Sequence, residues 1–167
     1  MTVERVYKQI EAELGFNMVP NVFKAMAAHP GFLEAMWGMF RATVIEGRLP
    51  RVVKEMIGIV VSYVHGSSYA RDVHLHSLTV QGIDKDVLGV LARGDTPSRG
   101  LPPAHAAVLA FARIAASTPT GIPDVSRDAL VRAGLDAEEI LEVIATISLF
   151  SAINAFTDVA NVKLDGI

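Results

Sequence analysis

The fold of this chain is decided by the stretch from Pro50 to Gln81, PRVVKEMIGIVVSYVHGSSYARDVHLHSLTVQ. Apolar residues recur at helical spacing on both sides of Gly66, and Pro50 suits the first turn of a helix. The pattern predicts two helices, over residues 50–65 and 67–81. Because Gly66 separates them directly, we expect an antiparallel hairpin of helices hinged at this glycine.

Two ionisable side chains of this hairpin are placed to meet. Glu55 lies 11 residues before Gly66 and His74 lies eight after it, so at a rise of about 1.5 Å per residue their heights differ by less than one turn. On the second helix, Ser67, Ala70 and His74 follow i, i+3, i+7 spacing and share one face. Since helical side chains lean toward the N-terminus, the imidazole points back over Ala70. A carboxylate, an imidazole and a helix start are predicted to converge.

Such a site suits a cysteine at position 67. Its thiolate would be stabilised by the unpaired N–H groups of the helix start, and the Glu55–His74 pair would handle its proton. The chain contains no cysteine. A serine hydroxyl is a much weaker acid than a thiol and needs a base within hydrogen-bond reach. Thiol chemistry, disulfides and thiolate metal sites are therefore excluded for this sequence.

The spacing of Glu55, Ser67, Ala70 and His74 resembles the AhpD-like alkylhydroperoxidases of the carboxymuconolactone decarboxylase superfamily, in the branch often labelled peroxidase-related. That family carries Glu, Cys, Cys and His, the last three within GCxYCxxxH. This chain has GSSYARDVH, with Gly66 and His74 in register and both cysteines replaced.

The resemblance covers nearly the whole chain. It includes MVPNVFKAMAAHPGFLEAM at 18–36, LPRVVKEMIGIVVSYVHG at 49–66 and AEEILEVIATISLFSAINAFTDVAN at 137–161. It implies an all-α, AhpD-like helical bundle whose central hairpin carries the site, with Ser67 and Ala70 at the two cysteine positions. In the family, one thiolate attacks a peroxide and the second cysteine resolves the sulfenic acid. The serine hydroxyl at position 67 and the alanine methyl group at position 70 cannot be oxidised by a peroxide in this way.

The resemblance thus implies a peroxidase-related protein that is inactive as a thiol peroxidase. Serine and alanine are also the replacements chosen to disable cysteines, so an engineered variant of a GCSYC parent and a natural cysteine-less member both fit. Two other functions stay open. One is a cofactor-free decarboxylase or isomerase that uses His74 as acid or base. The other is a non-catalytic protein that binds a small molecule.

Helical spacing continues along the rest of the chain. Further helices are expected at 3–14, 21–28, 31–47, 84–92, 104–116, 123–134 and 136–162. We expect the 31–47 helix to be buried on most sides, because its apolar residues have mixed spacings. One domain over 1–167 is predicted, with front helices at about 2–92, a surface connection rich in Gly, Pro and Ser at 93–103, and rear helices at about 104–162.

Composition limits the partners. A formal charge of -3 with scattered Lys and Arg gives nucleic acid little to bind. Residues 143–156 are apolar but interrupted by Thr, Ser and Asn, which predicts a core or interface helix and no membrane span. The start of the chain lacks signal-peptide features, so a cytoplasmic location is expected. With 51% hydrophobic residues, the chain is expected to form a homo-oligomer, a dimer, trimer or hexamer.

Some residues have simpler interpretations. Ser67 fits a helix N-cap that accepts a backbone N–H bond, in preference to the nucleophile of a Ser67–His74–Glu55 triad. His65 fits a cap at the end of the first hairpin helix. His76 faces away from His74, so no metal site is expected, and no cofactor is implied. Four large side chains fit either a substrate pocket or plain core: Met36, Trp37, Met39 and Phe40.

Overall fold

The protein is built from helices packed around one central helix. This computed structural model describes residues 2–97 and 100–166, and no strand occurs in these two ranges. The helices are α1 (Val3–Leu14), α2 (Asn21–Met26), α3 (Pro30–Phe40), the π-helical turn η1 (Arg41–Ile45), α4 (Arg51–His65), α5 (Ser68–Val80), α6 (Lys85–Ala92), α7 (Pro103–Ser117), α8 (Asp124–Arg132) and α9 (Ala137–Val159). The predicted all-α class is confirmed.

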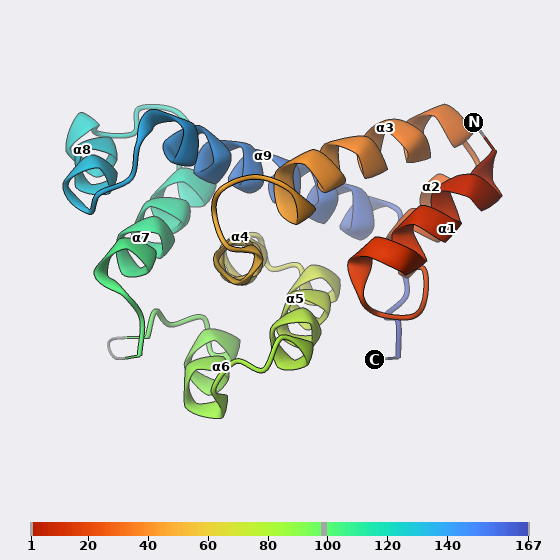
Figure 1. Ribbon diagram of the computed structural model, residues 1–167, viewed down its shortest axis with the longest axis horizontal. Helices are drawn as coiled ribbons and strands as arrows, with labels where there is room; N and C mark the ends of the chain where they lie inside the picture. The colour runs from red at the N-terminus through yellow and green to blue at the C-terminus, as the bar shows by residue number, and fades with distance from the viewer. Residues whose placement is uncertain (1, 98–99, 167) are drawn as a thin grey trace.

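The helix α4 forms the centre of the bundle. Figure 1 shows it nearly end-on, with α5, α7 and α9 around it, and all three pack against it. Residues 53–62 are buried without interruption, because every face of α4 meets another helix. Helices from the front and the rear of the chain therefore share one core element.

The expectation that the 31–47 helix is buried on most sides is wrong. In α3 the buried side chains are Leu33, Trp37 and Phe40, which follow i, i+4, i+7 spacing and form a single face. The α-helix also ends at Phe40 and continues as the π-helical η1. The high apolar content of this segment misled the prediction, because Phe32 and Met39 are 38% and 44% exposed.

The predicted α4–α5 hairpin is confirmed. Gly66 ends α4 in the left-handed region with φ 73°, and its backbone N–H bonds to carbonyls of the last turn. A residue without Cβ adopts this conformation at little cost. The turn returns the chain at once into α5, so the two helices pack side by side.

A buried charge network fixes the start of α4. Lys54 is fully buried, and its Nζ donates to the Glu46 carbonyl at 2.6 Å and pairs with Glu142 at 3.2 Å. Glu142 also accepts from the backbone N–H groups of Arg48 and Leu49, at 2.7 and 2.9 Å. Burial would raise the pKa of Glu142, but these donors hold it below its ordinary value. The network anchors the turn before α4 to α9.

Most described residues of the connection predicted at 93–103 are exposed, and residues 98–99 lie outside the described ranges. Gly94 and Pro97 are buried. A Cβ at Gly94 would lie 2.3 Å from the Tyr63 ring, and the Gly94 carbonyl accepts a hydrogen bond from Arg113. The segment is therefore packed against α4 and α7 rather than only spanning the surface.

The last helix, α9, starts with the predicted capping box, in which Asp136 and Glu139 bond to each other's backbone N–H groups. Among the described residues, α9 is the one helix that is both long enough and apolar enough to cross a membrane. It packs against α4, α5 and α7. These contacts account for its apolar face as part of the core of the bundle.

Candidate functional site

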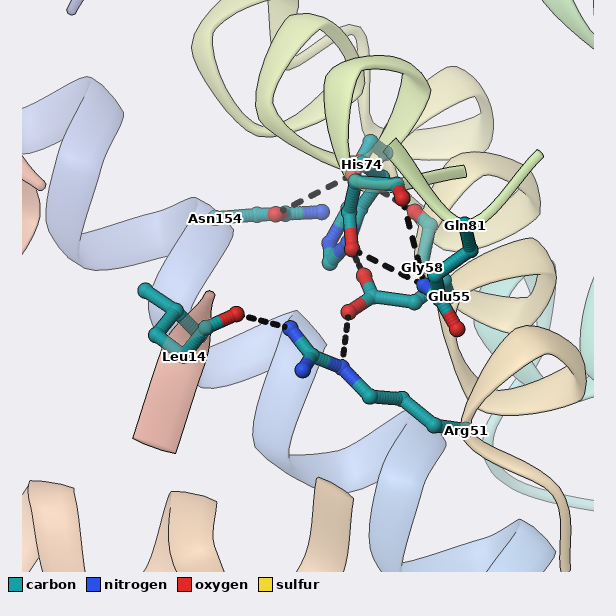
Figure 2. Close-up of polar contacts among 9 residues, drawn as sticks. Leu14, Arg51, Glu55, Gly58, His74, Gln81 and Asn154 are labelled. Carbon is teal, nitrogen blue, oxygen red and sulfur yellow. Dashed lines mark hydrogen bonds and ion pairs between the residues drawn. The ribbon is translucent and has the colours of Figure 1, made fainter. Parts of the chain in front are cut away.

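Glu55 of α4 and His74 of α5 form a buried hydrogen-bonded pair. The distance from Glu55 Oε2 to His74 Nδ1 is 2.7 Å, and the two residues are only 2% and 5% exposed. The predicted contact across the hairpin is confirmed, and Figure 2 shows the two side chains meeting between the helices. A carboxylate and an imidazole in this arrangement form an acid–base pair with Nδ1 already engaged.

Arg51 supports Glu55 from one turn earlier on α4. Its Nε lies 3.2 Å from Glu55 Oε1, and its Nη2 donates to the Leu14 carbonyl at 2.8 Å (Figure 2). Burial would raise the pKa of Glu55, but the hydrogen bond and charge of His74, together with Arg51 and Ser77, hold it below its ordinary value. Glu55 is therefore an anion held between two partners.

The His74 ring is fixed by packing as well as by its hydrogen bond. It lies edge-on to Phe150 of α9, with ring centroids 4.4 Å apart. A Cβ built on Gly58 would stand 2.4 Å from His74 Nε2. The absence of a side chain at position 58 therefore lets the imidazole fit against α4.

A small cavity of about 40 Å³ lies beside the pair. Its polar lining residues include Glu55, His74 and Tyr69, and the rest of the lining is mostly apolar. The apolar lining residues are Leu14, Phe16, Pro20, Val22, Phe23, Phe40, Ala70, Val73, Phe150 and Ile153. This volume is close to that of about one water molecule. The cavity is therefore an apolar, largely closed space next to an acid–base pair.

The two positions that correspond to cysteines differ in their surroundings. Ala70 lines the cavity with His74. Ser67 is fully buried, and its Oγ donates to Asp158 Oδ1 at 3.1 Å. Ser67 does occupy the N-cap position of α5, but the expected bond from its side chain to a backbone N–H is absent. That prediction is wrong, because the hydroxyl lies at the Asp158 carboxylate of α9, to which it donates, and accepts no N–H of α5.

A hydrolase-like triad is not assembled. Among the described residues the hydrogen-bond partner of the Ser67 hydroxyl is Asp158, and no hydrogen bond joins Ser67 to His74. A serine needs a base within hydrogen-bond reach to act as a nucleophile. Four residues were expected to meet at one site. Glu55, Ala70 and His74 do line one cavity, whereas the Ser67 hydroxyl bonds to Asp158 of α9.

The end of the described chain borders the site. Tyr69 donates its phenolic proton to Asp165 at 2.6 Å and accepts the backbone N–H of Val22 at 3.0 Å. Asp165 also accepts the backbone N–H of Asn21 at 2.6 Å. Burial, followed by the bond to Asp165, raises the pKa of Tyr69 well above its ordinary value. Tyr69 therefore links the cavity wall to the 161–166 segment as a neutral phenol.

Of the four large side chains that fit pocket or core, Phe40 lines the cavity. Trp37 stacks on Phe40 with centroids 5.8 Å apart. Met39 is 44% exposed. His65 lies in the last turn of α4, as predicted, and its Nε2 is 3.2 Å from the Ala116 carbonyl of α7.

Sequence reasoning did not single out Arg51, Gly58, Asp158 or Asp165 as parts of the site. The i, i+4 spacing of Arg51 and Glu55 was a usable signal. The two aspartates lie 91 and 96 positions from the residues they bind, so no local pattern reveals them. Within the described ranges, no group of three or more His, Cys, Asp or Glu side chains is placed to hold a metal.

A larger hollow of about 670 Å³ lies away from the pair, between α7, α9 and the 117–123 loop. Phe111, Ile122, Arg127 and Ile144 are among its lining residues. We assign the candidate site to the smaller cavity because Glu55 and His74 line it and this hollow lacks such a pair among its lining residues.

The sequence profile of the carboxymuconolactone decarboxylase family matches residues 30–113, which include α4, α5 and the Glu55–His74 pair. The chain belongs to this family. It is also 29% identical over 121 residues to an alkyl hydroperoxide reductase of Mycobacterium tuberculosis. That alignment covers 72% of this chain and 33% of the relative, so the chain spans about a third of the length of that protein.

Solved structures share the fold of this family member. A peroxidase-related protein described as an AhpD core, from Ralstonia eutropha JMP134, superposes with a TM-score of 0.87 at 20% identity, over 98% of this chain and 85% of that one. One from Silicibacter sp. TM1040 gives 0.86 at 21% identity, over 98% and 84%. A cysteine-to-alanine variant of the debrominase Bmp8 with 2,3,4-tribromopyrrole gives 0.84 at 22% identity, over 98% and 86%. The AhpD-like architecture is thereby established.

Proposed function

We propose that this protein keeps the ligand pocket and proton relay of a peroxidase-related family member, and that it does not reduce peroxides as its sequence stands. The proposal rests on the Glu55–His74 pair, which is assembled at 2.7 Å beside a cavity lined by Ala70. The proton-handling part of a thiol site is thus complete. The thiols are missing, since the chain has no cysteine.

The chemistry left to the site is proton transfer. Glu55 is anionic and accepts from His74 Nδ1, and both residues line the cavity, so the pair can exchange a proton with a ligand there. The aromatic lining favours a small, planar and mostly apolar ligand. The brominated pyrrole held by the structurally similar debrominase supports this class of ligand. A homo-oligomer in the cytoplasm is part of the same proposal.

Restoring both cysteines tests the peroxidase-related proposal. The double variant Ser67→Cys/Ala70→Cys is expected to reduce an organic hydroperoxide with a dithiol donor, and the unmodified chain is not. Adding His74→Ala to the double variant should remove most of the activity, by about 10²–10⁴-fold, whereas His105→Ala on the same background should not. Equal activity with and without the cysteines would contradict the proposal.

Ligand binding has its own measurement. The single tryptophan, Trp37, stacks on the cavity residue Phe40, so a brominated pyrrole in the cavity should quench its fluorescence. Ala70→Leu fills the cavity and is expected to abolish saturable quenching. Identical quenching in this variant would show that the probe binds elsewhere.

A second candidate is favoured by one observation, the intact acid–base pair in an apolar pocket of a chain without cysteine. It is a cofactor-free lyase or isomerase that uses His74 as acid or base, in line with the decarboxylase family to which the chain belongs. Turnover of a carboxylated lactone by the unmodified protein, lost in His74→Ala and kept in His105→Ala, would favour this activity. No turnover, with binding retained, would leave a ligand-binding protein.

A further inference from the structure

The site is narrow in this structure. Its cavity of about 40 Å³ is far below the roughly 300–1,000 Å³ that pockets for small ligands enclose. Part of the wall must therefore move before a ligand can reach His74. The inference below deepens the proposed function, because it concerns the same site.

The part of the wall that is not helical is the segment 15–20. It contributes Phe16 and Pro20 to the lining, while the other lining residues lie on helices α1, α2, α3, α4, α5 and α9. Asn17 in this segment has φ 54°, a left-handed conformation that is uncommon for a residue other than glycine. Moving this segment disturbs fewer regular hydrogen bonds than moving a packed helix.

Both ends of the segment are held by hydrogen bonds. After it, the backbone N–H groups of Asn21 and Val22 bond to Asp165 and Tyr69, at 2.6 and 3.0 Å. Before it, the Leu14 carbonyl accepts from Arg51 Nη2 at 2.8 Å. Arg51 differs from the other anchors, because its Nε also pairs with Glu55 Oε1 at 3.2 Å.

We propose that Arg51 is a positioning residue that couples closure of the 15–20 segment to the proton shared by Glu55 and His74. While the segment is closed, Leu14 and Glu55 hold the guanidinium between them. When it opens, the carbonyl withdraws and Arg51, whose side chain is 24% exposed, turns toward solvent. Glu55 then loses one cationic partner, and its full charge acts on His74.

Few other charges bear on the pair. Ser77 of α5 completes the partners of Glu55, and Tyr69 faces the same cavity. From α9, the uncharged Phe150 contacts His74. His76 packs edge-on against Phe16 of the segment, with ring centroids 5.1 Å apart. The ring resonances of His76 must therefore be assigned separately from those of His74.

The test compares Arg51→Met and Arg51→Lys with the unmodified protein by nuclear magnetic resonance. In Arg51→Met the ring resonances of His74 are expected to move, because its partner Glu55 loses the contact with the guanidinium. The amide protons of Asn21 and Val22 are expected to exchange about tenfold faster, because the segment opens more often. Arg51→Lys keeps the positive charge but lacks the planar fork that reaches Glu55 through Nε and Leu14 through Nη2, so it is expected to restore the slow exchange only in part.

Arg41→Met is the matched control. Arg41 bonds to Glu13 of α1 at 2.7 Å and has no bond to Glu55. The Arg41→Met variant therefore removes an arginine contact to α1 without changing a partner of the Glu55–His74 pair. Both readouts should stay at their original values. Faster exchange with unchanged His74 ring resonances in Arg51→Met would show that Arg51 only holds the segment in place. Equal effects of Arg41→Met would show general loosening of the fold. Neither readout needs a ligand or a thiol, so a failed peroxidase assay leaves this test intact.

Discussion

Ser67 and Ala70 stand one turn apart at the start of α5, yet only Ala70 faces the acid–base pair. The Ser67 hydroxyl is bound to Asp158 at 3.1 Å, while Ala70 lines the cavity with His74 and Glu55. The two positions that the sequence resemblance matches to cysteines are therefore inequivalent. One lies beside a carboxylate and the other beside an imidazole.

This asymmetry predicts different thiol reactivity in single variants. In Ser67→Cys, the Asp158 carboxylate disfavours a thiolate and raises the thiol pKa. In Ala70→Cys, a nearby imidazolium favours the thiolate. Alkylation by iodoacetamide at neutral pH is expected to be about tenfold faster for Ala70→Cys, and Asp158→Asn should narrow the difference. Faster alkylation of Ser67→Cys would show that the roles are reversed.

Gly58 is predicted to be essential for the position of His74. In Gly58→Ala the new methyl group would start 2.4 Å from His74 Nε2, so the buried ring must shift. The free energy of unfolding in urea is expected to fall by about 1–3 kcal/mol, and the His74 ring resonances should move. Gly38→Ala is the control, because a Cβ built on Gly38 would have nothing within 4 Å. This substitution within a helix should be neutral or should stabilise the fold by up to about 1 kcal/mol.

Stability at acid pH should depend on Glu55. The folded-state pKa of this carboxyl lies below its ordinary value of 4.5, so its contribution is complete above that value. It is lost as the pH falls through the folded-state pKa. In Glu55→Gln the free energy of unfolding should depend less on pH in this range. At neutral pH the free energy of unfolding should fall by about 3–5 kcal/mol, because His74 and Arg51 lose a buried charged partner. An unchanged acid limb in this variant would contradict the assignment.

Tyr69 is predicted to stabilise the fold through its hydroxyl. Tyr69→Phe leaves the Val22 N–H and the Asp165 carboxylate without this partner, which should lower the free energy of unfolding by about 1–3 kcal/mol. Tyr63→Phe removes a phenolic hydroxyl from a residue that is 41% exposed and should change stability by less than about 0.5 kcal/mol. Chemical denaturation of both variants gives the comparison. Equal effects would mean that the bonds of Tyr69 add little.

Much of the architecture could be predicted because helix formation depends on residues that are close together in the sequence. The spacing of apolar residues, Gly66 at the hinge and the Asp136–Glu139 capping box all act within a few residues of one another. The contact of Glu55 with His74 was predictable for the same reason, since a tight hairpin fixes the relative heights of its two helices. The burial of 31–47 was not, because composition does not reveal which faces meet a neighbour.

The sequence by itself determined an all-α chain, an acid–base pair across one hairpin and, through the absence of cysteine, the loss of thiol chemistry. The tertiary structure alone decided that Ser67 binds Asp158, that Tyr69 binds Asp165, and that the cavity beside His74 is small. The physical reason is distance along the chain. The partners in these two contacts lie 91 and 96 positions apart in the sequence. Such contacts arise from how the helices pack, which no local spacing of residues encodes.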